Sequence, residues 1–154
     1  MPMPGWRDSL AVYVRWLHAC GERPQRAPAD AATRSAFIAQ AHALGKHVPA
    51  DYLEYARIMD GMCDLGRSIY AIGPVAPRAG VLNFGWVNVA LDVYPRRTYY
   101  GDDGLISYLH DADIGLYWFA DRASGTLVEP FETFEALLNR VLGDMAREVA
   151  EDAP

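Results

Sequence analysis

The chain has 154 residues, of which 51% are hydrophobic and 22% charged, a composition typical of one globular domain with an apolar core. Its net charge of −6 is unevenly distributed, because residues 1–100 carry +3 and residues 101–154 carry −9. An acidic half repels phosphate backbones and anionic lipids, which argues against a nucleic-acid or membrane partner and favours a basic protein surface as the partner.

The cysteine content and the start of the chain indicate a reducing compartment. Cys20 and Cys63 have no close partner in the sequence, so we expect two buried thiols and no disulfide. The first residues lack a basic region followed by an apolar core, which predicts that no signal peptide is present. No run approaches about 20 uncharged apolar residues. These features together predict a cytoplasmic protein.

Two helices are predicted within the first 45 residues. Apolar residues recur at three- and four-residue steps over residues 6–17, and Gly21 ends this helix. Residues 21–28 form a polar linker with two prolines. Asp30 is expected to cap a second helix that runs to Leu44, with Phe37, Ala41 and Leu44 on its inner face.

A third helix and a short strand follow. The helix begins after Pro49 and closes at Gly61, and its inner face consists of Tyr52, Tyr55, Ala56 and Met59. Residues 68–72 predict a strand, and residues 77–80 predict a turn.

Residues 86–94 fit two patterns. Strict alternation of apolar side chains at 87, 89, 91 and 93 predicts a strand, whereas residues 87, 90, 91 and 94 share one face of a helix. Because periodicity does not decide short apolar runs, both interpretations remain open.

The last third of the chain predicts a β-meander and one helix. Four short β-like runs, separated by turns rich in aspartate and glycine, cover residues 98–100, 106–109, 116–120 and 126–129. Thr133 is expected to cap a final helix with an apolar stripe, and residues 148–154 are expected to form a frayed tail. Helices first, an antiparallel sheet in the middle and a C-terminal helix packed on one sheet face indicate an α+β fold.

Side chains able to carry chemistry are few. His110, Asp111 and Asp113 crowd one turn and would be the ligands of a metal-assisted hydrolase, but no CxxC or HExxH spacing supports a metal site. None of the serines lies in a G-x-S-x-G motif, and the acidic neighbour Asp64 disfavours a reactive thiolate at Cys63. The four tryptophans lie in apolar patterns and are expected in the core. We therefore predict no catalytic residue, no cofactor and no metal.

Three short motifs carry a family resemblance. They are Leu44-Gly45, Val48-Pro49-Ala50-Asp51-Tyr52 and Met59-Asp60-Gly61. Their order and spacing resemble the LG…LPxDY…NG opening of the SUKH superfamily, which is related to a fungal cell-wall assembly regulator. Residues 69–72 and 117–122 resemble two strands of that family, and residues 131–138 its final helix. The resemblance spans roughly residues 36–143, with Asp60 where the family has asparagine.

The resemblance implies a division of the chain and a function. Residues 1–28 would be an additional N-terminal helix and linker, and residues 29–147 the SUKH-like domain. Bacterial members of the family are associated with polymorphic toxin systems as immunity proteins, so the expected partner is a cognate toxin domain, possessing a basic cleft if it is a nuclease. The residues predicted to bind it are acids expected to be exposed in the turns: Asp102, Asp103, Asp111, Asp113 and Asp121. A regulatory or scaffolding module without a toxin partner is the alternative.

Overall fold

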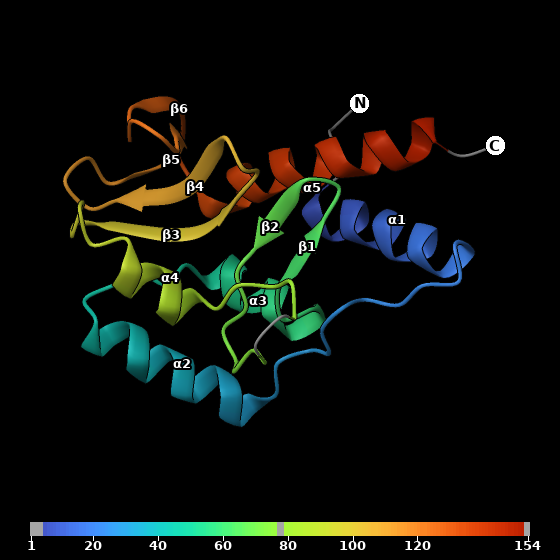
Figure 1. Ribbon diagram of the computed structural model, residues 1–154, viewed down its shortest axis with the longest axis horizontal. Helices are drawn as coiled ribbons and strands as arrows, with labels where there is room; N and C mark the ends of the chain where they lie inside the picture. The colour runs from blue at the N-terminus through green and yellow to red at the C-terminus, as the bar shows by residue number, and fades with distance from the viewer. Residues whose placement is uncertain (1–4, 77–78, 153–154) are drawn as a thin grey trace.

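A computed structural model describes residues 5–76 and 79–152 and has an α+β fold (Figure 1). The described residues form five helices: α1 (Trp6–Ala19), α2 (Ala31–Ala43), α3 (Ala50–Ile58), α4 (Phe84–Ala90) and α5 (Phe134–Glu151). They also form six strands: β1 (Met62–Asp64), β2 (Arg67–Ile69), β3 (Arg97–Asp102), β4 (Ile106–Asp111), β5 (Leu116–Asp121) and β6 (Leu127–Phe131). The predicted turn at residues 77–80 includes two residues, 77 and 78, that lie outside the described residues.

The six strands form one antiparallel sheet in the order β1-β2-β3-β4-β5-β6. Each strand pairs with its neighbour in sequence, so the predicted meander is confirmed. The aspartates of the turns explain the tight connections. In the β3–β4 turn the Asp103 carboxylate accepts hydrogen bonds from the backbone N–H groups of Leu105 and Ile106, and the following Gly104 has a positive φ of 91°.

The β1–β2 hairpin differs from the prediction. The expected strand at residues 68–72 ends at Ile69, and the strand β1 had no counterpart among the predicted elements. Its turn is built by Leu65 and Gly66, both with positive φ (51° and 74°). Two consecutive positive φ values are typical of a type I′ hairpin turn, which glycine favours and leucine does not. Because leucine occupies the first turn position, the sequence gives no sign of this hairpin.

The core lies between the sheet and the helices. The aromatic rings of Tyr52 from α3, Tyr100 from β3 and Phe134 from α5 pack edge to face, with centroids 5.0–5.7 Å apart. The α5 helix covers one face of the sheet, and α1 lies alongside α5 (Figure 1). Because α1 buries Trp6, Leu10, Tyr13 and Leu17, the segment expected to be an addition to the domain contributes to its core.

The prediction of a frayed tail from residue 148 is wrong for residues 148–151. The α5 helix continues to Glu151, and Val149 is only 2% exposed. In addition, the guanidinium of Arg67 donates two hydrogen bonds to the Glu148 carboxylate, at 2.9 and 3.0 Å. Burial of one apolar side chain and a bidentate ion pair hold this last turn in place.

Residues 84–90 form helix α4, which decides between the two interpretations of this segment. The Asn83 side chain caps it by accepting a hydrogen bond from the backbone N–H of Trp86. On the inner side of the helix, the amide of Asn88 exchanges hydrogen bonds with the backbone N–H and C=O of Tyr99. Asn88 thus provides hydrogen-bond partners for the backbone of β3 at Tyr99, where β3 does not pair with β2. At this position α4, and not a further strand, lies beside β3.

Several side chains lie elsewhere than the sequence pattern predicts. Trp6 is buried as expected, but Trp86 is 65% exposed, and Leu44 of the predicted inner face of α2 is exposed. Both Cys20 and Cys63 are exposed free thiols, in contrast to the predicted burial.

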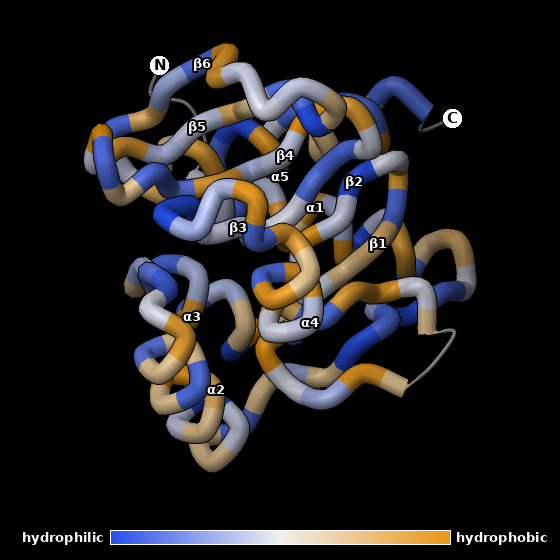
Figure 2. The backbone as a smooth tube through the Cα atoms, turned by 60° about the vertical axis from the view of Figure 1, so that its left-hand side comes forward, coloured by the Kyte–Doolittle hydropathy of each residue, from blue (hydrophilic) through white to orange (hydrophobic). Residues whose placement is uncertain are grey.

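Within the described residues, the helices are all too short or too polar to cross a membrane. In Figure 2 the backbone around α4 is orange at several positions, which marks apolar residues.

Candidate partner-binding groove

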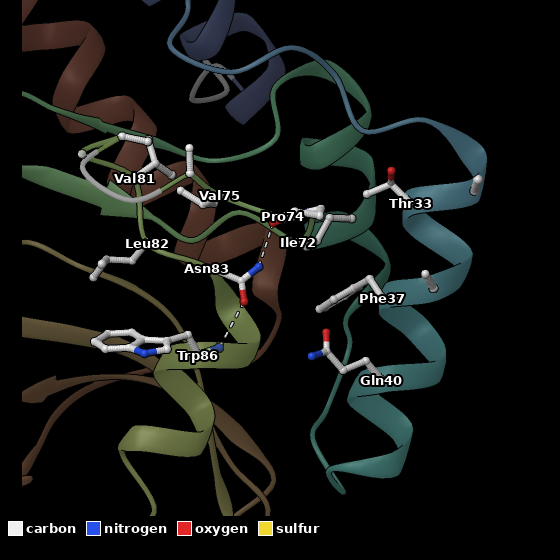
Figure 3. Close-up of a pocket in the computed structure, with 16 residues that line it drawn as sticks. Thr33, Phe37, Gln40, Ile72, Pro74, Val75, Val81, Leu82, Asn83 and Trp86 are labelled. Atoms are coloured by element: carbon white, nitrogen blue, oxygen red, sulfur yellow. Dashed lines mark hydrogen bonds between the residues drawn. The ribbon is translucent and has the colours of Figure 1, made fainter.

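An apolar groove of about 1120 Å³ lies between α2 and the segment that leads from β2 to α4 (Figure 3). Among its 16 described lining residues there is no aspartate, glutamate, lysine or arginine. Its polar groups are the side chains of Thr33, Gln40 and Asn83. These 16 residues therefore offer an apolar surface with only a few hydrogen-bonding positions.

One wall of the groove is the outer side of α2. Ala32 and Ala36, four residues apart, lie on the same face of the helix and present only methyl groups. Phe37 forms the floor, since its ring is 2% exposed and packs edge to face on Phe84, with centroids 4.8 Å apart. The small side chains of this wall let a ligand approach the helix backbone closely.

The opposite wall includes residues 72–76 and 79–83, and these two segments are fixed together. Ala71 and Asn83 form a parallel β-bridge, in which the backbone N–H of Ala71 donates to Leu82 at 2.8 Å. The Asn83 side chain also donates to the carbonyl of Gly73 at 2.7 Å, as Figure 3 shows, while its oxygen caps α4. One asparagine therefore connects the wall of the groove to the helix that carries Trp86.

Asp60 fixes this wall from below. Its buried carboxylate accepts hydrogen bonds from the backbone N–H of Ile72 at 2.7 Å and of Gly73 at 3.1 Å. It also forms an ion pair with Arg26, whose Nη2 lies 2.9 Å from Oδ2. A charge-assisted arrangement of this kind is stronger than neutral hydrogen bonds, so the start of this wall is firmly held at Ile72 and Gly73.

Trp86 stands at the end of the groove, where its indole is largely exposed. Three further exposed apolar side chains are near it in the sequence: Val89 on α4, and Leu82 and Val93 outside the helix. Trp86 and Val89, three residues apart, lie on one face of α4. Since the inner side of α4 is also apolar, through Phe84 and Val87, the helix has no polar face toward solvent.

The acidic residues predicted to bind a partner do not share these properties. Asp103 and Asp113 are exposed as expected, and Asp121 is half-buried, but Asp102 and Asp111 are buried. Asp102 is the last residue of β3 and Asp111 the last residue of β4, and each has a partner within the fold. Asp102 accepts a hydrogen bond from the Tyr70 hydroxyl at 2.7 Å, and Asp111 pairs with buried Arg97. The prediction of exposure is therefore wrong for Asp102 and Asp111.

The five acids also lie at opposite ends of the sheet. Asp102, Asp103 and Asp121 are near the start of β4, since Ile106 pairs with Asp121, whereas Asp111 and Asp113 lie at its other end. At about 3.4 Å per residue, the six residues of β4 separate the two groups by roughly 17 Å. Arginines further reduce their net charge through pairs with Asp102, Asp111 and Asp113. The acids do not form one continuous acidic surface.

The three residues considered as metal ligands do not converge either. Neighbouring residues of a strand point to opposite faces, so His110 and Asp111 diverge. His110 stacks on His47, while Asp111 pairs with Arg97 on the other face and Asp113 pairs with Arg96. Among residues 5–76 and 79–152, no three histidine, cysteine, aspartate or glutamate side chains are close enough to hold a metal ion.

Sequence reasoning missed the groove, although part of its signal was present. The shared helical face of Trp86 and Val89 is visible in the sequence once the segment is known to be a helix. The groove itself arises from the approach of α2 to residues 72–76 and 79–83, which no local pattern encodes. In the comparisons with known proteins, no family model matches the chain, and no curated protein matches it either.

Proposed function

We propose that this chain is a non-catalytic protein-binding domain that acts as an immunity protein and neutralises a cognate bacterial toxin by direct binding in the cytoplasm. The observation that carries this proposal is the apolar groove that ends at the exposed indole of Trp86, here named the Trp86 groove. Exposed tryptophans next to apolar pockets are the usual anchors of protein interfaces, because burying one indole removes a large apolar area from water.

The exposed apolar side chains on and next to α4 support a protein as the ligand. Trp86 and Val89 are 65% and 60% exposed on this short helix, and Val93, which follows it, is 80% exposed. A contiguous apolar patch on a soluble domain is costly unless a partner covers it. This surface replaces the aspartates of the turns as the centre of the proposed interface.

The motifs that resemble the SUKH superfamily also fit a binding domain without catalytic residues, because each of them serves the fold. Gly45 and Gly61 have positive φ values of 68° and 86°, Pro49 precedes the first turn of α3, and Tyr52 is fully buried. Residues devoted to the fold leave the surface free to vary with the partner. The immunity function itself rests on the resemblance and on fold-level analogy.

A regulatory or scaffolding module without a toxin partner is the second candidate, since the same groove would serve it. A metal-assisted hydrolase at His110, Asp111 and Asp113 is the least favoured, because their side chains point to different surroundings. The gene neighbourhood separates the first two candidates. A neighbouring gene that encodes a large protein with a small C-terminal toxin domain favours the immunity function.

Co-expression with that toxin domain tests the proposal. We expect the chain to restore growth of cells that express the toxin and to bind the purified domain with nanomolar affinity in calorimetry. Trp86→Ala should weaken binding more than tenfold, whereas Leu105→Ala, which removes an exposed apolar side chain from the β3–β4 turn, should not. If the wild-type chain neither protects growth nor binds the toxin domain, the immunity function is contradicted.

A further inference from the structure

A second, smaller pocket lies on the face of the sheet that α5 does not cover. It has a volume of about 270 Å³, and its 13 lining residues all lie between Leu91 and Gly125, a stretch that the structure describes throughout. The ring of Tyr100 packs on Phe134 of α5, so the preceding Tyr99, which lines the pocket, points to the opposite face. The pocket is therefore separate from the core between the sheet and α5.

The floor of this pocket is apolar apart from one hydroxyl group. Ser107 and Leu109 lie two residues apart on β4 and share a face, and Ala120 pairs with Ser107 from β5. Ser107 is only 5% exposed, and within the described residues its hydroxyl forms no hydrogen bond. Since a buried hydroxyl without a partner costs free energy, this group favours a ligand that supplies one. We name the cavity the Ser107 pocket.

The charged side chains that line the Ser107 pocket already have partners within the fold. These pairs are Arg97 with Asp111, Arg122 with Asp102, and Asp121 with Ser124. A carboxylate or an ammonium group that entered the pocket would lose water without gaining a free counter-ion. The lining therefore favours an uncharged ligand.

The two walls of the Ser107 pocket are joined at its rim. The guanidinium of Arg97 lies 4.0 Å from the centroid of the Tyr94 ring, and its Nη1 donates to the carbonyl of Gly125 at 2.8 Å. The Tyr94 hydroxyl donates to the carbonyl of Ser124 at 3.2 Å. These contacts fix the segment after α4 to the β5–β6 turn, which reduces the ordering that a ligand must impose.

The size and position of the pocket indicate a single side chain as the ligand. Its volume lies below the range of ~300–1,000 Å³ typical of small-molecule sites. An apolar cavity of about 150 Å³ is sufficient for benzene, so one aromatic ring with a substituent fits. Val93 both lines the pocket and is exposed beside Trp86 and Val89 in the sequence, so the pocket continues the apolar surface proposed to bind a protein.

We infer that the Ser107 pocket receives a tyrosine side chain of the protein partner, an inference that rests on the proposed protein-binding function. The tyrosine ring packs on Leu109 and Tyr99, and its phenol group forms a hydrogen bond with the Ser107 hydroxyl. A phenylalanine would leave Ser107 without a partner, and a glutamate would bury an uncompensated charge. Tyrosine supplies both the apolar area and the polar atom, as it does at many protein interfaces.

Three small probes test this inference without the toxin. They are 4-methylphenol, toluene and propionate, which reproduce the side chains of tyrosine, phenylalanine and glutamate. Each is titrated into the full chain labelled with ¹³C at alanine and leucine methyl groups, and the Ala120 and Leu109 signals are followed. Ser107→Ala removes the hydroxyl from the pocket. Ser68→Ala is the matched control, because its hydroxyl is also buried without a partner but does not line the pocket.

We expect 4-methylphenol to shift both methyl signals at millimolar concentration and to bind about fivefold more tightly than toluene, because it adds one hydrogen bond. Propionate should leave the signals unchanged. Ser107→Ala should reduce the affinity for 4-methylphenol to that for toluene, whereas Ser68→Ala should not change it. Equal binding of 4-methylphenol and toluene to the wild type, tighter binding of propionate, shifts confined to another surface, or no shifts would overturn the inference.

The toxin domain separates the inference from the proposed function. Ser107→Ala should weaken its binding about fivefold, and Ser68→Ala should not. A chain that shows the expected probe preferences but neither binds the toxin nor protects cells supports the inference and contradicts the immunity function. A chain that protects cells while Ser107→Ala binds the toxin as tightly as wild type is an immunity protein whose partner does not use the pocket, and the inference is then wrong.

Discussion

The imidazole of His47 stacks on the imidazole of His110, with ring centroids 4.1 Å apart and planes inclined by 22°. His47 lies between α2 and α3, and His110 lies on β4, so the pair joins the helical layer to the sheet. The Nε2 atom of His47 is 2.7 Å from the Tyr117 hydroxyl, while Nδ1 of His110 is buried without a hydrogen-bond partner. Two stacked rings cannot both be protonated at low cost.

This pair predicts a loss of stability in acid. Burial lowers the pKa of His47, and burial together with the nearby His47 lowers the pKa of His110 to about 4, although the neighbouring Asp111 opposes this shift. The unfolded chain protonates these groups near 6.5, while the folded chain does so only at lower pH. The free energy of unfolding should therefore fall as pH decreases from about 6.5 to 4, by roughly 1–2 kcal/mol after allowance for solvent screening.

Urea denaturation at pH 7.5, 6.5, 5.5 and 4.5 measures this effect. Carboxylates also titrate in acid, so the informative quantity is the difference between variants. His110→Gln should reduce the loss between pH 6.5 and 4.5, whereas His18→Gln, at an exposed position of α1, should follow the wild type. An equal slope for His110→Gln and wild type would show that the stacked pair does not control the acid response.

Asp60 is expected to be the most sensitive carboxylate of the chain. Asp60→Ala leaves the backbone N–H groups of Ile72 and Gly73 without acceptors and leaves Arg26 without its anion. The loss should be about 3–5 kcal/mol of unfolding free energy, because an unpaired buried donor or charge costs far more than an exposed pair contributes. Asp113→Ala, which breaks the exposed pair with Arg96, should cost no more than about 0.5 kcal/mol in the same denaturation experiment.

Local patterns predicted much of the fold, because the sequence marks its regular elements clearly. The β3–β6 meander has aspartate and glycine at each turn, and the α5 stripe is uninterrupted from Phe134 to Met145. Asp30 caps α2 as expected, since its carboxylate accepts from the Thr33 N–H at 2.7 Å. In these elements, local propensity and tertiary packing favour the same structure.

The errors arise where tertiary contacts override the local pattern. In sequence, Asp102 and Asp111 resemble exposed turn acids. Both are buried in the structure, because Asp102 binds the Tyr70 hydroxyl, 32 residues away in sequence, and Asp111 pairs with the buried guanidinium of Arg97. Trp86 lies in an apolar run, and only the capping of α4 by Asn83 turns its side chain outward. The candidate site was missed for the same reason, since it combines α2 with a segment more than 30 residues later.

Gly61 explains why the third resemblance motif ends in glycine. Its φ is 86°, and an added Cβ would lie 2.8 Å from the backbone nitrogen of Ala71. Gly61→Ala should destabilise the chain by about 3 kcal/mol or more, because both the dihedral angle and the backbone contact oppose a side chain. Gly104→Ala provides the matched control, since its φ is 91° but the space around its Cβ is open. It should cost about 1 kcal/mol, so similar melting temperatures for the two variants would refute the steric part of this explanation.

Two tryptophans separate the needs of the fold from those of binding. Trp6 is 1% exposed and packs against Tyr55, so Trp6→Ala should lose about 3–5 kcal/mol of unfolding free energy through the cavity that it leaves. Trp86→Ala should change stability by less than about 1 kcal/mol, because most of the indole contacts only solvent. Guanidinium denaturation followed by circular dichroism gives both values. A loss for Trp86→Ala as large as that for Trp6→Ala would mean that the indole serves the fold, and its exposure would then no longer argue for a partner.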